Sequence, residues 1–108
     1  MPWPPQGLYA DTPRRIRVYL RKNTWFNHIC AYHPELNNCL DDVMNTISDP
    51  EAIYDDDGAY VSYRYSEKRG KYIMVIYHIV GRVGRVKTAY AVNDPIPEIM
   101  ECNKVYPR

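Results

Sequence analysis

The sequence predicts a small α+β domain in which two N-terminal helices pack on one face of a four- to five-stranded, mainly antiparallel sheet. Three patterns support this prediction: an alternating segment near the N-terminus, an apolar helical stripe after it, and further alternating segments separated by glycine turns. The length of 108 residues fits one domain. The content of 45% hydrophobic and 25% charged residues is ordinary for a folded globular protein.

We expect the chain to be organised in three segments. Residues 1–13 are rich in proline and form an extended arm, because each proline fixes φ and removes a backbone donor. Residues 14–93 form the α+β domain. Residues 94–108 form a second proline-rich segment, a tail that crosses the sheet or hangs free.

The first strand is predicted at residues 15–21, where side chains alternate with the period of two of a half-buried strand. The buried face consists of Ile16, Val18 and Leu20. The outer face consists of Arg15, Arg17, Tyr19 and Arg21.

Two helices are predicted next. Thr24 can cap the first helix, whose apolar stripe consists of Trp25, Ile29 and Tyr32; Leu36 extends this stripe only if the helix continues past Pro34. Pro34 disfavours helical geometry at His33, so the helix breaks there. A second helix then runs to about Ser48 and stops before Pro50.

The rest of the chain is predicted to form a meander of antiparallel strands. A short strand opens at residues 53–54, and longer strands follow at 60–65, 72–80 and 86–92. The segment 72–80 is apolar on both faces, which is typical of a central strand.

Charge is segregated although the net charge is only +1. No Lys or Arg occurs between Asn23 and Tyr63, whereas stretches 14–22 and 64–87 hold most of the 14 basic residues. This pattern can give the molecule one face that attracts phosphate. A mixed, solvated surface after folding is the alternative that stays open.

The sequence also bears on location. Three cysteines, without paired spacing, favour reduced thiols and a cytoplasmic localisation. No apolar run approaches the roughly 18 residues that span a bilayer, and the N-terminus lacks the pattern of a secretory signal. We therefore expect no membrane partner.

Two histidines, His28 and His33, are candidate acid/base groups. The dipole at the start of the second helix disfavours the charged form of His33, and a neutral imidazole is what a general base requires. The alternative is structural: His33 caps the second helix, and His28 is a surface residue. His28, Cys30, His33 and Cys39 match no familiar zinc spacing, so we expect neither a metal nor a cofactor.

The last strand carries a possible phosphate site. Lys87 and the neighbouring Arg85 can offset charge on a pentacovalent phosphorane, while the hydroxyls of Thr88 and Tyr90 can orient the scissile phosphate. Alternation places Thr88 and Tyr90 on one face and Lys87 on the other, and only a bulge would bring Lys87 and Thr88 together. An ordinary strand with a polar outer face is the alternative.

The outer face of the first strand is a candidate RNA-binding surface. Arg15, Arg17 and Arg21 can grip phosphates and Tyr19 can stack on a base, with Arg85 as a further cation. A solvated edge strand protected by its charges is the alternative.

Together, these segments resemble the phage-associated barnase–EndoU–colicin–RelE-like nuclease domains. The resemblance covers roughly residues 24–92 and rests on the order and spacing of its motifs. These are a tryptophan and a histidine ahead of His33-Pro34-Glu35-Leu36, then Asp49-Pro50-Glu51-Ala52-Ile53, then Tyr72-Ile73-Met74-Val75-Ile76, then Val86-Lys87-Thr88-Ala89-Tyr90.

The resemblance implies a metal-independent endoribonuclease that serves as a toxin in a phage or toxin–antitoxin conflict system, with tRNA or mRNA as substrate and an antitoxin or immunity protein as neutralising partner. It implies that His33 is the acid/base histidine and His28 a second candidate, with Glu35 at the same site. Lys87, Thr88 and Tyr90 would line the phosphate site. A noncatalytic nucleic-acid- or protein-binding module that kept the fold is the alternative hypothesis.

Overall fold

One mixed sheet organises the molecule in the computed structural model, which describes residues 3–107. Its strands lie in the order β1-β2-β6-β5-β4-β3-β7. The bounds are β1 Leu8–Asp11, β2 Arg17–Leu20, β3 Ala52–Asp56, β4 Ala59–Ser66, β5 Lys71–Val80, β6 Val83–Val92 and β7 Asn103–Tyr106. Neighbouring strands are antiparallel except β2 and β6, which pair in parallel.

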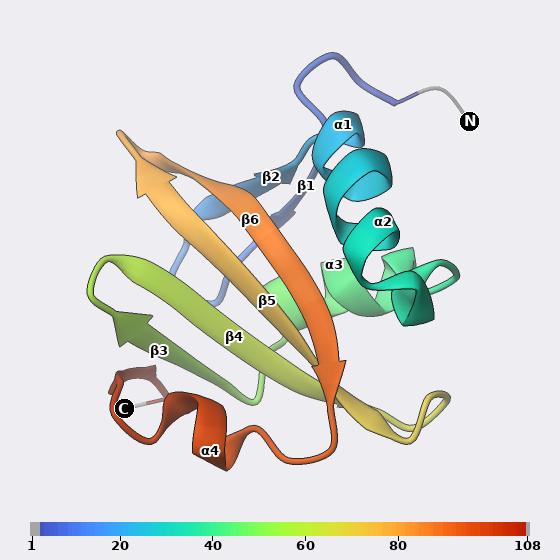
Figure 1. Ribbon diagram of the computed structural model, residues 1–108. Helices are drawn as coiled ribbons and strands as arrows, with labels where there is room; N and C mark the ends of the chain where they lie inside the picture. Colours follow the sequence, from blue (N-terminus) through green and yellow to red (C-terminus); the bar gives the residue numbers. More distant parts are fainter. Residues whose placement is uncertain (1–2, 108) are drawn as a thin grey trace.

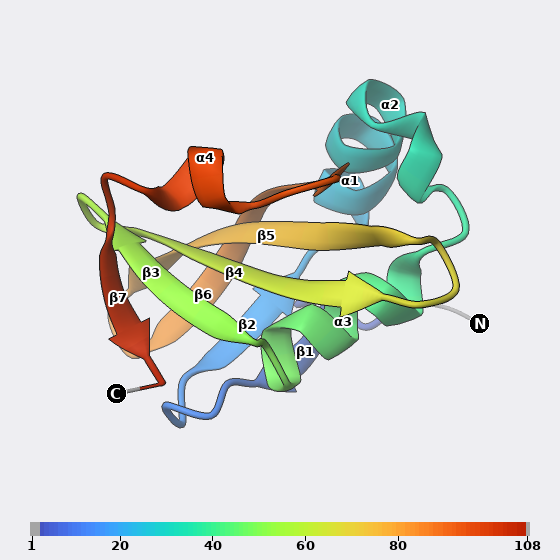
Figure 2. The same cartoon turned by 90° about the horizontal axis from the view of Figure 1, so that it is seen from below.

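Short helical elements surround this sheet. The bounds are α1 Lys22–Thr24, the π-helical η1 Trp25–Ile29, α2 Cys30–Tyr32, the 3-10 helix η2 Pro34–Leu36, α3 Leu40–Ser48 and α4 Ile96–Ile99. The consecutive elements α1, η1 and α2, here called the helical segment, lie beside β6, while α3 and α4 lie on opposite sides of the sheet (Figures 1 and 2).

The predicted fold class is therefore wrong in its details. The described chain forms a seven-stranded mixed sheet, not a four- to five-stranded antiparallel one, and two regular helices do not cover one face. Both proline-rich segments contribute strands, because Leu8–Asp11 forms β1 beside β2 and Asn103–Tyr106 forms β7 beside β3. These two segments become strands through backbone hydrogen bonds to β2 and β3, although their side chains show little of the alternation that predicts a strand.

The predicted helices also need correction. The second helix ends at Ser48 as predicted, but regular helix begins only at Leu40, after η2 and a turn. The first helix contains a π-helical turn in which the Cys30 N–H donates to the Trp25 carbonyl. Such a wide turn shifts the helical phase, and Tyr32, predicted to be buried, is 71% exposed.

The central strands follow their sequence pattern. The segment predicted to be a central strand is β5, the middle strand of the seven. Its side chains alternate between two cores: Ile73, Val75 and Tyr77 on one face, and Met74 on the other.

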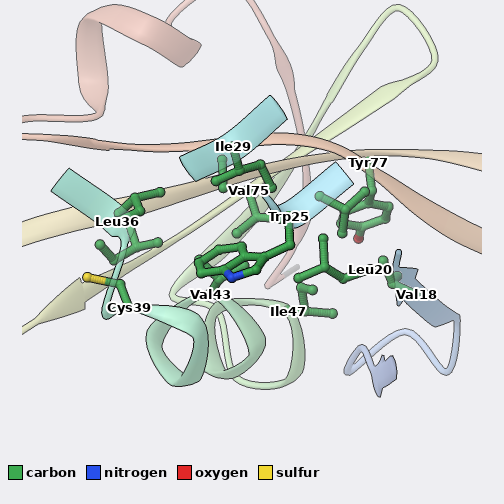
Figure 3. Packing of buried hydrophobic residues seen from close by; sticks show 13 residues of the cluster. Val18, Leu20, Trp25, Ile29, Leu36, Cys39, Val43, Ile47, Val75 and Tyr77 are labelled. Carbon is green, nitrogen blue, oxygen red and sulfur yellow. The ribbon is translucent and has the colours of Figure 1, made fainter. Parts of the chain in front are cut away.

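The main core lies between the sheet, the helical segment and α3 (Figure 3). Its buried side chains include Leu20 from β2, Trp25 and Ile29 from the helical segment, and Val43 and Ile47 from α3. On the other face, Ile99 of α4 packs on Val61 and Met74 in a smaller cluster. No helix within residues 3–107 has the length and apolar character needed to cross a membrane.

The parallel contact between β2 and β6 depends on Gly84. A Cβ at this position would lie 2.8 Å from Cγ2 of Val18 and 3.2 Å from Cδ2 of Tyr77, both in the main core. We expect Gly84→Ala to lower the free energy of unfolding by about 1–3 kcal/mol through overpacking, measured by urea denaturation. The comparison variant Gly81→Asn, at φ +66 with open space around it, should lower that energy by no more than about 1 kcal/mol, because Asn is among the few residues that adopt the left-handed region. An unchanged midpoint for Gly84→Ala would contradict this close packing.

Candidate active site and nucleic-acid interface

Strand β6 contains a bulge at Lys87. Thr88 pairs with Ile76 of β5 and Val86 pairs with the next residue, Tyr77, so Lys87 is the extra residue. Val86 and Ala89 are both buried in the main core. Lys87 and Thr88, which lie between them, are therefore both directed toward the opposite face of the sheet.

This bulge corrects the predicted orientation of Lys87. In a regular strand, Lys87 and Thr88 would point to opposite faces, but here they share the face that also carries Arg85 and Tyr90. Lys87 is exposed and Thr88 is half-buried. One strand thus presents cations and hydroxyl groups on a single surface.

The helical segment brings His33 to this surface. Strand β2 ends at Leu20, and the helical segment takes its place beside β6. It ends at His33, which has φ −130° and ψ 69°, because the following Pro34 disfavours helical geometry. The centroid of the His33 ring lies 5.7 Å from that of Tyr90, with 36° between the ring planes.

His33 also contacts Glu35. Its Nδ1 atom lies 3.7 Å from Oε2 of Glu35, an ion-pair distance longer than a hydrogen bond. The contact places Nδ1 of the ring on the side of the Glu35 carboxylate. The regular helix predicted to start beside His33 begins only at Leu40, and the three-residue η2 follows His33 instead.

Tyr90 is a half-buried proton donor. Its hydroxyl donates to Oε2 of Glu98 at 3.4 Å. Burial, with a further contribution from the Glu98 carboxylate, raises the pKa of the Tyr90 phenol. The phenol therefore stays protonated at neutral pH and can donate a hydrogen bond or a proton.

The structure separates His28 from these residues. His28 is exposed on the helical segment, and its ring lies 5.2 Å from that of Tyr32, which faces solvent. The third histidine, His78, was not predicted as a site residue; it lies on β5 opposite Arg85. Four residues of strand separate His78 from Met74, the partner of Tyr90, which corresponds to about 13 Å. Of the three histidines, His33 is the one in ring contact with Tyr90.

A cavity of about 780 Å³, here called the arm cavity, lies at β2 and β6, on the face of the sheet that carries Tyr19 and Arg85. It is open to solvent and is bordered by the N-terminal arm, the outer face of β2 and the start of the helical segment. Its lining residues are Trp3, Pro4, Pro5, Gln6, Tyr19, Arg21, Lys22, Asn23, Phe26, Asn27, Val83 and Arg85.

Three of the predicted RNA-binding residues, Tyr19, Arg21 and Arg85, line the arm cavity. Two others do not. Arg17 donates two hydrogen bonds to the Asp11 carboxylate, at 2.9 and 3.2 Å, and lies over the Tyr9 ring at 4.0 Å. Arg15 has a φ of 66° in the turn before β2.

The sequence pattern did not indicate the aromatic lining. Trp3 comes from the proline-rich arm, and Phe26 follows a buried tryptophan in the helical segment. Phe26 lies next to the apolar stripe of Trp25 and Ile29 but outside it, and this was the available sequence signal that its ring lies outside the core. The ring is 51% exposed.

Metal and thiol chemistry have little basis in the described residues. Residues 3–107 contain no group of three or more His, Cys, Asp or Glu side chains placed to hold a metal ion. Burial raises the pKa of the Cys30 and Cys39 thiols, which opposes formation of the nucleophilic thiolate.

Comparisons with protein-family models, curated proteins and solved structures find no match to this chain. The resemblance to the nuclease domains therefore remains a prediction, and function has to be argued from the site itself.

Proposed function

We propose that this chain is a metal-independent endoribonuclease-like domain. One observation carries the proposal: the His33 imidazole is in ring contact with the Tyr90 phenol, on the face to which the β6 bulge directs Lys87 and Thr88. These residue types supply a base, a proton donor, a cation and an orienting hydroxyl. Cleavage of RNA through its own 2′-hydroxyl needs these groups and no metal.

In the proposed step, the 2′-oxygen attacks the adjacent phosphorus. The O2′–P bond forms, and the P–O5′ bond breaks. His33 accepts the proton of the 2′-hydroxyl, and the Tyr90 hydroxyl turns from Glu98 and gives its phenolic proton to the departing 5′-oxygen. The imidazolium then returns a proton to the phenolate, because phenolate is a stronger base than imidazole. The products are a 2′,3′-cyclic phosphate and a 5′-hydroxyl.

The other residues of the site act on charge and geometry. The Lys87 ammonium offsets negative charge on the phosphorane, and Thr88 orients the phosphate. Glu35 is a positioning residue, because its carboxylate lies beside Nδ1 of His33 and favours the tautomer with Nε2 free to accept a proton.

The test is cleavage of end-labelled single-stranded RNA by the full chain in excess EDTA. We expect cleavage to persist, the 5′ fragment to end in a 2′,3′-cyclic phosphate, and DNA of the same sequence to stay intact because it lacks the nucleophile. Loss of cleavage in EDTA, cutting of the DNA, or no cleavage of any RNA would overturn the proposal.

A noncatalytic nucleic-acid-binding module is the second candidate function. The observation in its favour is that the arm cavity, with its arginines and aromatic rings, is separate from the contact of His33 with Tyr90. Such a module would bind RNA with an affinity that falls linearly with salt on logarithmic axes, and it would show no turnover. Product analysis in the cleavage assay separates the two functions.

A further inference from the structure

We infer that the arm cavity binds one unpaired nucleobase of a single-stranded nucleic acid. The inference rests on the proposed function, because it names the place where the RNA substrate is held outside the reacting centre. The volume of about 780 Å³ is within the range of small-ligand sites.

The first support is the aromatic lining. Trp3 and Phe26 approach each other edge to face, with ring centroids 5.9 Å apart and planes at 67°. Tyr19 lines the same cavity from the outer face of β2. Phe26 is 51% exposed, so its ring is accessible from the cavity. Exposed aromatic rings around a cavity are the surfaces on which unpaired bases stack.

The second support is charge. Arg21, Lys22 and Arg85 line the cavity, and none of its lining residues is Asp or Glu. By contrast, Arg17 on the same face of β2 is neutralised by Asp11. The occupant that fits aromatic rings and uncompensated cations together is an anionic ligand with a flat ring, which describes a nucleotide.

The third support is the amide pair on the helical segment. Asn23 and Asn27 line the cavity, and the Asn27 side-chain amide donates a hydrogen bond to the Asn23 side-chain oxygen. Each amide carries donors and acceptors beyond this bond. Asn side chains can pair with the edges of bases, so these residues can distinguish one base from another.

The arm makes the cavity selective for unpaired bases. Gly7 turns the arm over the end of β2 with φ +96°, and a Cβ at this position would lie 2.2 Å from the Leu20 carbonyl oxygen. The arm residues Trp3 to Gln6 consequently form one wall of the cavity. A base that is unstacked from its neighbours can enter such a site, whereas a base inside a duplex cannot.

The cavity is also distant from the proposed reacting centre. Arg85 and Tyr90 are five residues apart on β6, which corresponds to about 16 Å before the bulge is considered. The bound base therefore belongs to a nucleotide a few positions from the scissile phosphate. It would set which RNA is cleaved without touching the atoms that react.

The experiment uses the full chain and a single-stranded DNA hexamer, which lacks the 2′-hydroxyl and cannot be cleaved by the proposed step. Binding is followed by tryptophan fluorescence and, with a labelled hexamer, by anisotropy. We expect saturable quenching from Trp3, because the other tryptophan, Trp25, is buried in the core. Trp3→Phe should remove the quenching but keep binding, since phenylalanine can also stack.

Two further variants locate the site. Phe26→Ala should weaken hexamer binding about tenfold, which is the scale of one lost base stack. Arg21→Ala should weaken binding and reduce its salt dependence, whereas Arg17→Ala, the matched control on the same strand face, should change affinity by less than about twofold because Arg17 is paired with Asp11.

The outcomes separate this inference from the proposed function. The inference is overturned if the hexamer does not quench Trp3, if a duplex of the same sequence binds equally well, or if polyglutamate competes as effectively as the hexamer. Cleavage of RNA without quenching by the hexamer would leave the nuclease proposal standing and remove the base site. Specific hexamer binding without RNA cleavage would support the base site and overturn the nuclease proposal.

Discussion

His33→Ala should reduce the rate of RNA cleavage by about 10²–10⁴-fold, which is the usual contribution of a general acid or base. The reason is the position of His33: its ring contacts Tyr90, and its Nδ1 lies 3.7 Å from the Glu35 carboxylate. The rate is measured under single-turnover conditions, so that slow product release does not hide the chemical step. RNA binding, measured separately by anisotropy, should change little, because His33 does not line the arm cavity.

The matched control is His28→Ala. His28 lies on the same helical segment but is exposed, and its ring contacts Tyr32 rather than Tyr90. We expect wild-type cleavage from this variant. Equal losses for the two variants would contradict the assignment of His33 as the base. The pair also tests the toxin role that the family resemblance implies: on that hypothesis, host growth should be arrested by the wild type and by His28→Ala, and restored by His33→Ala.

Much of the sheet could be predicted from alternation. Strands β4, β5 and β6 were predicted near their observed positions, β4 and β6 from alternation of their side chains and β5 from a continuous apolar run between two turns. The end of α3 at Ser48 was predictable because Pro50 lacks the N–H that a helix needs.

The edges of the sheet could not be predicted in the same way. Strands β1 and β7 are four residues long, lie within proline-rich segments and have no fully buried side chain. Their formation depends on backbone hydrogen bonds to partners elsewhere in the chain, β2 and β3. The parallel pairing of β2 with β6 joins segments more than 60 residues apart, and no local pattern encodes it.

The candidate site was predicted in part. The approach of His33 to the hydroxyl and ammonium groups of segment 87–90 was the central spatial hypothesis, and the structure places the His33 ring 5.7 Å from that of Tyr90. The shared face of Lys87 and Thr88 was considered only as the result of a bulge, and the sequence holds a signal for that bulge. Small or apolar residues change parity along β6, from Gly84 and Val86 to Ala89 and Ala91, and this change marks the bulge.

The arm cavity required tertiary structure. Trp3 and Phe26 are separated in sequence, and they meet because Gly7 turns the arm back over β2. Arg17 and Arg21 are equivalent by alternation, but only Arg17 has Asp11 opposite it, in β1. Strand β1, which the proline-rich sequence did not indicate, therefore determines that Arg17 is paired and that Arg21 can bind phosphate.

Trp25→Ala should lower the free energy of unfolding by about 3–5 kcal/mol, the usual cost of deleting a buried tryptophan. Trp25 is 3% exposed and packs in the main core with side chains of β2, α3 and β5 (Figure 3). Natural domains have a stability of roughly 5–15 kcal/mol, so this loss would bring the protein close to unfolding. Urea denaturation followed by circular dichroism measures it independently of tryptophan fluorescence.

The matched control is the next residue, Phe26, which is 51% exposed and contacts Trp3 instead of the core. Phe26→Ala should cost less than about 1 kcal/mol, and equal losses for the two variants would contradict the packing of the helical segment. The contrast also bears on function. Trp25 and Ile29 anchor the helical segment in the core, and His33 follows directly after that segment. Trp25→Ala should therefore lower the rate of cleavage together with stability. Phe26→Ala should weaken only the binding of single strands. Phe26 lines the arm cavity, whereas His33, the general base of the proposed reaction, does not.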